Sequence, residues 1–116
     1  MNVLDTGIII NMLKEKKYRP GAISPLTLIE TLRGIDGKKR TRVKQLMEES
    51  FAILNIDNKT IETYCEIYCK LKTEGHPLPD ADLLIASTAI ANNFFLETND
   101  EHFQRLKTLG LKLKQP

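Results

Sequence analysis

Short apolar runs alternate along the chain with longer segments in which apolar residues recur every three to four positions. The short runs are typical of buried strands, and the longer segments are typical of helices that bury one face. Strands are expected at residues 2–4, 22–23, 51–56, 94–96 and 111–113. Helices are expected at residues 6–16, 25–33, 38–49, 58–74 and 81–92, and in a short segment that follows Thr98.

Residues that cap helices stand where the helical segments begin. The pair Ser24–Pro25 is a clear helix start, because serine accepts a hydrogen bond from a backbone N–H and proline fits the first helical position. Thr6 and Asp80 are expected to cap the helices that follow them. Thr98 and Glu101 have the spacing of a capping box.

The alternation of short strands with helices predicts an α/β fold. Because parallel strands are buried on both faces, we expect a three-layer α/β/α sandwich around a short central parallel sheet. The chain has 116 residues, with no internal repeat or linker, and residues 1–116 fit a single domain. Ligands of such sheets bind beyond the carboxyl ends of the strands, so the residues that follow each strand are the candidates for a site.

Charge is nearly balanced, with 17 basic and 15 acidic residues, and does not by itself indicate a nucleic-acid-binding protein. Its distribution is more informative, because two basic groups could contact phosphates. A solvated helix face is the alternative for these charge runs. The first group comprises Lys38, Lys39, Arg40, Arg42 and Lys44. The second comprises Arg105, Lys107, Lys112 and Lys114.

The apolar runs also indicate where in the cell the protein is expected. None approaches the roughly 18 residues that a membrane span needs. The first residues lack the basic segment of a signal peptide, and Asp5 interrupts the apolar stretch early. We therefore expect a cytoplasmic protein.

The two cysteines, Cys65 and Cys69, are four residues apart in a predicted helix and share one face of it. Free cysteines are commonly buried, so we expect both thiols in the core. A disulfide or a two-cysteine metal site is the alternative, although nothing in the sequence completes a zinc-binding set.

Four acids from four separate segments are placed to converge at the carboxyl edge of the sheet. Asp5 follows the first strand, Asp100 follows the strand at 94–96, and Glu30 lies in the helix after the second strand. Asp82 is the most informative, because it shares a helix face with apolar residues and an ionised carboxylate there needs compensation.

Each acid also has an ordinary interpretation, such as a helix cap, a partner for the helix dipole or a surface charge. Their joint placement favours a site, because carboxylates gathered in one place cannot all stay ionised without a counter-charge. An all-oxygen set suits Mg²⁺ or Mn²⁺, and phosphodiester hydrolysis is the natural chemistry of such an ion.

Four stretches of the chain resemble the motifs of PIN domains, and in particular those of the toxins of VapBC-type toxin–antitoxin pairs. Residues 3–6 (VLDT) are similar to the opening strand with its first acid, and residues 27–30 (TLIE) match the second acid. Residues 79–86 (PDADLLIA) resemble the central motif, and residues 96–100 (LETND) resemble the last. The resemblance covers essentially the whole chain, in matching order and spacing.

The resemblance implies an Mg²⁺- or Mn²⁺-dependent endoribonuclease that cleaves single-stranded RNA. It implies a metal on Asp5, Asp82 and Asp100, with Glu30 as the fourth catalytic acid. It further implies a VapB-like antitoxin as partner, and homodimers are common in the family. The implied supporting residues, which would orient ligands or waters, are Thr6 and Thr98, with Asp80 a further acid whose part is open.

Two departures and several rival interpretations remain. Gly7 and Asn99 stand where a polar residue and an arginine are frequent, which bears on substrate choice.

A PIN fold kept as a non-catalytic RNA- or protein-binding scaffold is the main alternative. A haloacid-dehalogenase-type phosphatase needs an acid at position 7, and a response-regulator receiver needs a pair of acids before its first helix. His76 and His102 are lone histidines, for which solvent or capping roles are expected.

Overall fold

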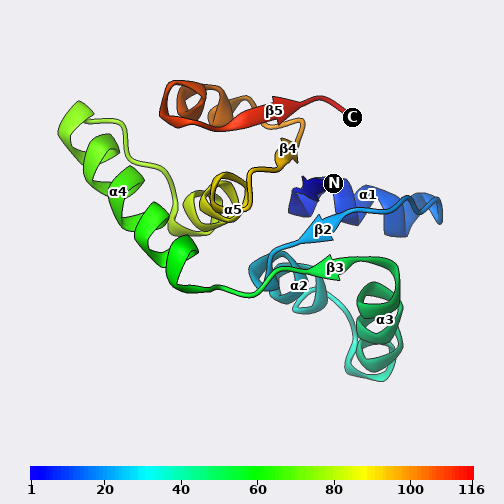
Figure 1. Ribbon diagram of the computed structural model, residues 1–116. Helices are drawn as coiled ribbons and strands as arrows, with labels where there is room; N and C mark the ends of the chain where they lie inside the picture. Colours follow the sequence, from blue (N-terminus) through cyan, green and yellow to red (C-terminus); the bar gives the residue numbers. More distant parts are fainter.

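The computed structural model describes residues 1–116 and contains a five-stranded sheet in which every pairing is parallel. The strand order is β3-β2-β1-β4-β5 (Figure 1). The strands are β1 (Asn2–Leu4), β2 (Ala22–Ile23), β3 (Ala52–Ile53), β4 (Phe95–Glu97) and β5 (Lys112–Lys114). The predicted α/β class and the parallel sheet are therefore confirmed.

Helices cover both faces of this sheet and separate its core into two parts. The α-helices are α1 (Thr6–Glu15), α2 (Pro25–Leu32), α3 (Gly37–Ser50), α4 (Asn58–Glu74) and α5 (Asp80–Ala91), and a 3₁₀ helix, η1, spans Glu101–Leu109. One core cluster joins β1 and β4 to α4, α5 and η1, and the other joins β1 and β2 to α1, α2 and α3. Side chains of successive strand residues point to opposite faces, which explains why Val3 and Leu4 are fully buried in different clusters.

Three helices have their cap one or two residues away from the predicted cap. Asp5 caps α1 in place of Thr6, and Asp100 caps η1 in place of Thr98. In both cases the carboxylate accepts from a backbone N–H near its own residue, whereas the threonine hydroxyl donates to an acid distant in the sequence. Asp80 does not cap α5, because Pro79 occupies the cap position without a side-chain hydrogen bond. Ser24 caps α2 as predicted, with Pro25 in its first turn.

Two further predictions were wrong. The strand expected at 51–56 shortens to Ala52–Ile53, because Phe51 ends α3 and packs in the core, and β3 is an edge strand that pairs only with β2. Cys65 and Cys69 are exposed. They lie across α4 from its buried stripe, which runs through Thr60, Ile67 and Leu71.

The strand order reverses at β1. The chain runs outward from β1 through β2 to β3, and then returns to place β4 on the other side of β1. Such a reversal opens a crevice at the carboxyl ends of the two strands, here between the residues that follow Leu4 and Glu97. None of the helices combines the length and the apolar character required of a membrane span.

Candidate active site

The four predicted acids line one cleft of about 500 Å³ at this reversal of strand order. Asp5 comes from the end of β1, Glu30 from α2, Asp82 from the first turn of α5 and Asp100 from the start of η1. Segments far apart in the sequence therefore present carboxyl groups to a single space, as the sequence predicted. The other lining residues are Thr6, Gly7, Ile8, Ile10, Asn11 and Asn99.

Asp5 is held by hydrogen bonds to both of its carboxylate oxygens. The backbone N–H of Thr6 donates to Oδ1 at 2.8 Å, and the hydroxyl of Thr98 donates to Oδ2 at 2.7 Å. The backbone is fixed as well, because the N–H of Asp5 donates to the carbonyl of Glu97 at 3.1 Å. Since a carboxylate oxygen accepts more than one hydrogen bond, each oxygen keeps a lone pair for a further partner.

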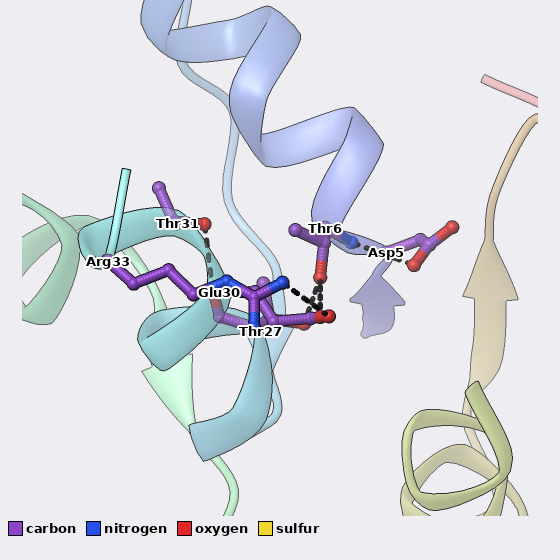
Figure 2. A network of polar contacts seen from close by, with 6 residues as sticks. All are labelled: Asp5, Thr6, Thr27, Glu30, Thr31 and Arg33. Carbon is purple, nitrogen blue, oxygen red and sulfur yellow. Dashed lines mark hydrogen bonds and ion pairs between the residues drawn. The ribbon is translucent and has the colours of Figure 1, made fainter. Parts of the chain in front are cut away.

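Glu30 is oriented from α1. The hydroxyl of Thr6 donates to its Oε1 at 2.8 Å and also lies 3.1 Å from the hydroxyl oxygen of Thr27 (Figure 2). Arg33, the C-cap residue that follows α2, approaches Oε2 at 3.9 Å, and its side chain is 72% exposed. Such an exposed pair contributes little to stability, so the Thr6 hydroxyl is the main restraint on Glu30.

Thr98 links two of the acids. Its hydroxyl proton is donated to Asp5, and its hydroxyl oxygen accepts a hydrogen bond from the backbone N–H of Asp100 at 3.0 Å. Asp100 in turn accepts from the backbone N–H of His102 at 2.9 Å, and the His102 Nδ1 lies 3.2 Å from its Oδ1. Thr6 and Thr98 thus each donate to an acid of the cleft, and their predicted part in orienting ligands or waters stays a prediction.

Burial and mutual repulsion act on the acids of the cleft. Burial raises the pKa of Asp5, hydrogen bonds from Thr98 and Thr6 partly oppose this, and the charges of Asp100 and Glu30 raise it further. Burial also raises the pKa of Asp82, and the charges of Asp5, Asp100 and Glu30 add to the effect. The cleft therefore concentrates negative charge that a cation would neutralise.

The acids line the cleft without being drawn together into a compact group. No set of three or more His, Cys, Asp or Glu side chains is close enough to hold a metal ion as the side chains stand. The donors are nevertheless all oxygen atoms, which is the set that Mg²⁺ and Mn²⁺ prefer.

Some predicted residues lie elsewhere, and some lining residues were not predicted. Asp80 points away from the cleft and accepts from the Tyr64 hydroxyl at 2.7 Å. Asn11 and Asn99 line the cleft, and the only sequence signal for Asn99 was its place inside the last motif. His102, for which a solvent or capping role was expected, lies beside Asp100. The basic residues Lys38, Lys39, Arg40, Arg42 and Lys44 are exposed on α3, and none lines the cleft.

A parallel sheet with four carboxylates at its point of reversal defines an α/β protein with an acidic crevice of the kind used for metal-assisted chemistry on phosphates. Comparison with known families makes this specific. Residues 3–109 match the PIN domain family, and the chain belongs to that family.

Curated relatives and solved structures place the chain near the VapC proteins. It is 40% identical to Ribonuclease VapC1 of Methanocaldococcus jannaschii over 96% of this chain and 85% of the relative. It is 31% identical to Ribonuclease VapC1 of Rickettsia felis over 92% of this chain and 91% of the relative. The crystal structure of VapBC2 from Rickettsia felis bound to a promoter DNA fragment contains a chain with a TM-score of 0.84 and 26% identity, covering 99% of this chain and 98% of that one.

Proposed function

We propose that this protein is an endoribonuclease that cleaves single-stranded RNA with the help of Mg²⁺ or Mn²⁺, and that it acts as the toxin of a toxin–antitoxin pair. The observation that carries the proposal is the convergence of Asp5, Glu30, Asp82 and Asp100 on one cleft. The curated relatives, which are named as ribonucleases of the VapC type, support the substrate class.

Asp5, Asp82 and Asp100 are the residues that would hold the ion. Asp5 has free lone pairs on both oxygens, and its orientation is fixed by Thr6 and Thr98. Burial is the main cause of the raised pKa values of Asp5 and Asp82, and the charges of the neighbouring acids raise them further, so a divalent cation would favour the ionised forms. The all-oxygen donor set fits a hard cation rather than zinc or copper.

The bound ion would lower the pKa of a water molecule and offset charge on the phosphodiester. Glu30 is oriented by the Thr6 hydroxyl, with Oε2 free of any short hydrogen bond, so it can position that water or complete the ligand set. The helix N-termini at Asp5 and Asp82 present their positive ends to the cleft, which favours anionic groups there.

A VapB-like antitoxin is the proposed partner, and a second copy of this chain is the proposed oligomeric partner. The likeness to the VapBC2 structure over nearly the whole of both chains supports the first. The α2–α4–α5 surface supports a protein contact, because it exposes several large apolar side chains around an apolar hollow. Ile56 and Ile61 line the hollow, and Ile29 of α2 and Tyr68 of α4 are exposed outside it.

The test is incubation of the purified protein with an end-labelled, largely single-stranded RNA, with Mg²⁺, with Mn²⁺ or with EDTA. We expect discrete cleavage products with either ion and none with EDTA. Binding of the RNA without cleavage under every condition would favour the non-catalytic scaffold instead. Cleavage that persists in EDTA would refute the metal-dependent reaction.

A further inference from the structure

Three hollows of the surface share one side chain, Asn99, just beyond the end of β4. Asn99 lines the acidic cleft, a hollow of about 150 Å³ beside β5 and a hollow of about 370 Å³ beside α1. We call the second the β5 hollow and the third the α1 hollow. The acidic cleft therefore adjoins both of these hollows at Asn99.

The β5 hollow has the chemistry of a phosphate-contacting surface. Lys107 of η1 and Lys114 of β5 line it, both are exposed, and neither forms an ion pair. Gln104 and Gln115 add amide donors, and only one of the nine lining residues is hydrophobic. Besides Asp100, which it shares with the cleft, the one acid of this hollow is Glu101.

The α1 hollow is less suited to a phosphate backbone. Its cations are Lys17 and Arg19, but Arg19 is bound to the buried carboxylate of Glu97 and is not free for a ligand. Glu15 lines the same hollow and offsets the remaining charge of Lys17. The α1 hollow therefore has one cation outside an ion pair, Lys17, whereas the β5 hollow has two, Lys107 and Lys114, and this number favours the β5 hollow.

The basic segment of α3 is a weaker candidate than the sequence suggested. None of its lysines or arginines lines the cleft or either neighbouring hollow. Lys44 is paired with Glu48 at 2.9 Å, and Arg40 donates to the carbonyl of Ile35. We propose that the RNA backbone leaves the acidic cleft past Asn99 across the β5 hollow, with its phosphates beside Lys107 and Lys114.

This path for the RNA rests on the proposed function. The physical reason for it is the negative charge of the cleft. A cleft lined by four acids repels phosphates, so a strand that enters it needs cations close by to hold the adjoining linkages. Lysine acts on a phosphate as a point charge on a flexible stem, and the two stems reach from different elements, η1 and β5.

The test measures the salt dependence of RNA binding in protein that carries Asp82→Asn, so that the RNA stays intact. Fluorescence anisotropy with a labelled single-stranded RNA gives the binding constant at several salt concentrations in Mg²⁺. One variant adds Lys107→Gln and Lys114→Gln, and a matched control adds Lys38→Gln and Lys39→Gln, which removes the same charge from α3.

We expect the slope of log affinity against log salt to fall by about 1.4 for the Lys107/Lys114 variant, at about 0.7 per lost phosphate contact on a single strand. The α3 control should leave the slope unchanged, and Glu101→Gln should strengthen binding. An unchanged slope in the Lys107/Lys114 variant, or an equal or larger loss in the α3 control, would overturn the path across the β5 hollow. Absence of RNA binding in every protein, together with absence of cleavage by the unmodified chain, would instead show that the proposed function is wrong.

Discussion

The ion pair between Arg19 and Glu97 gives a quantitative prediction about what supports the cleft. Glu97 ends β4, is 1% exposed, and accepts hydrogen bonds from Arg19 and from Asn2. Its backbone carbonyl also accepts the N–H of Asp5. Arg19→Met would leave a buried carboxylate with a single neutral donor.

The cost of this change follows from burial on each side of the pair. Removing one partner of a fully buried pair costs about 3–5 kcal/mol, but the Arg19 side chain is 46% exposed, so water can partly replace it. A hydrogen bond to a charged group is worth about 1.5–3 kcal/mol, and we expect a loss near the lower part of that range, about 2 kcal/mol. For a chain of 116 residues this lowers the unfolding temperature by about 8 °C.

The dependence on pH has a defined sign. Burial alone would raise the pKa of Glu97, but the hydrogen bonds from Arg19 and Asn2 and the charge of Arg19 outweigh it, so its pKa lies below the usual value. A carboxyl group with a depressed pKa stabilises the fold above its unfolded pKa, and that stability is lost as the pH falls. The deficit of Arg19→Met should therefore shrink below a pH of about 4.3, the usual glutamate pKa.

Thermal unfolding followed by circular dichroism, at neutral pH and through the acid range, measures both effects. Lys17→Met is the matched control, because Lys17 is exposed on the same loop and forms no ion pair. An Arg19→Met protein as stable as this control, or a deficit that does not change with pH, would refute the reasoning.

Three further predictions concern the cleft. Without metal, Asp82→Asn should raise the unfolding temperature, because it removes one charge from a repelling set, whereas Asp80→Asn should not; a lower temperature for Asp82→Asn would contradict the pKa shift described for it. Calorimetric Mg²⁺ affinity should fall as the pH drops toward the raised pKa values of Asp5 and Asp82, since protons compete with the ion; an affinity that does not change with pH would argue against these two ligands. Thr98→Val should slow RNA cleavage about 10- to 100-fold through loss of the hydrogen bond to Asp5, and Thr98→Ser should retain most of the rate; equal rates for the two variants would exclude this role.

The parallel sheet and the acid set could be predicted, because each follows from a local sequence pattern and one general rule. Short apolar runs that alternate with helices predict a parallel sheet, and acids that follow strands then share its carboxyl edge. Asp5, Glu30, Asp82 and Asp100 line one cleft for this reason.

Other features depend on tertiary packing and left no clear local signal. The burial of Glu97 could not be predicted from the sequence. Its partners Asn2 and Arg19 are distant in the sequence, and a charged residue after an apolar run is typical of the start of a loop. The cysteines were misplaced because α4 carries apolar residues on both faces, so its pattern does not identify the buried one. The caps of α1 and η1 were misassigned because an aspartate lies one or two residues from each predicted threonine cap. Tertiary contacts determine which of the two side chains accepts from the first backbone N–H groups of the helix.

The most direct test of the central claim compares RNA cleavage by Asp82→Asn and Asp80→Asn with cleavage by the unmodified protein in Mg²⁺. The two substitutions remove the same charge from the same helical turn, but only Asp82 faces the cleft, while Asp80 bonds to Tyr64. We predict that Asp82→Asn abolishes cleavage and that Asp80→Asn keeps the rate within about a factor of three of the unmodified rate. The asparagine oxygen can still accept the hydrogen bond from Tyr64, and weakening one such bond changes a rate by about that factor. Cleavage that survives Asp82→Asn, or that is lost equally in both variants, would contradict the assignment of this cleft as the active site.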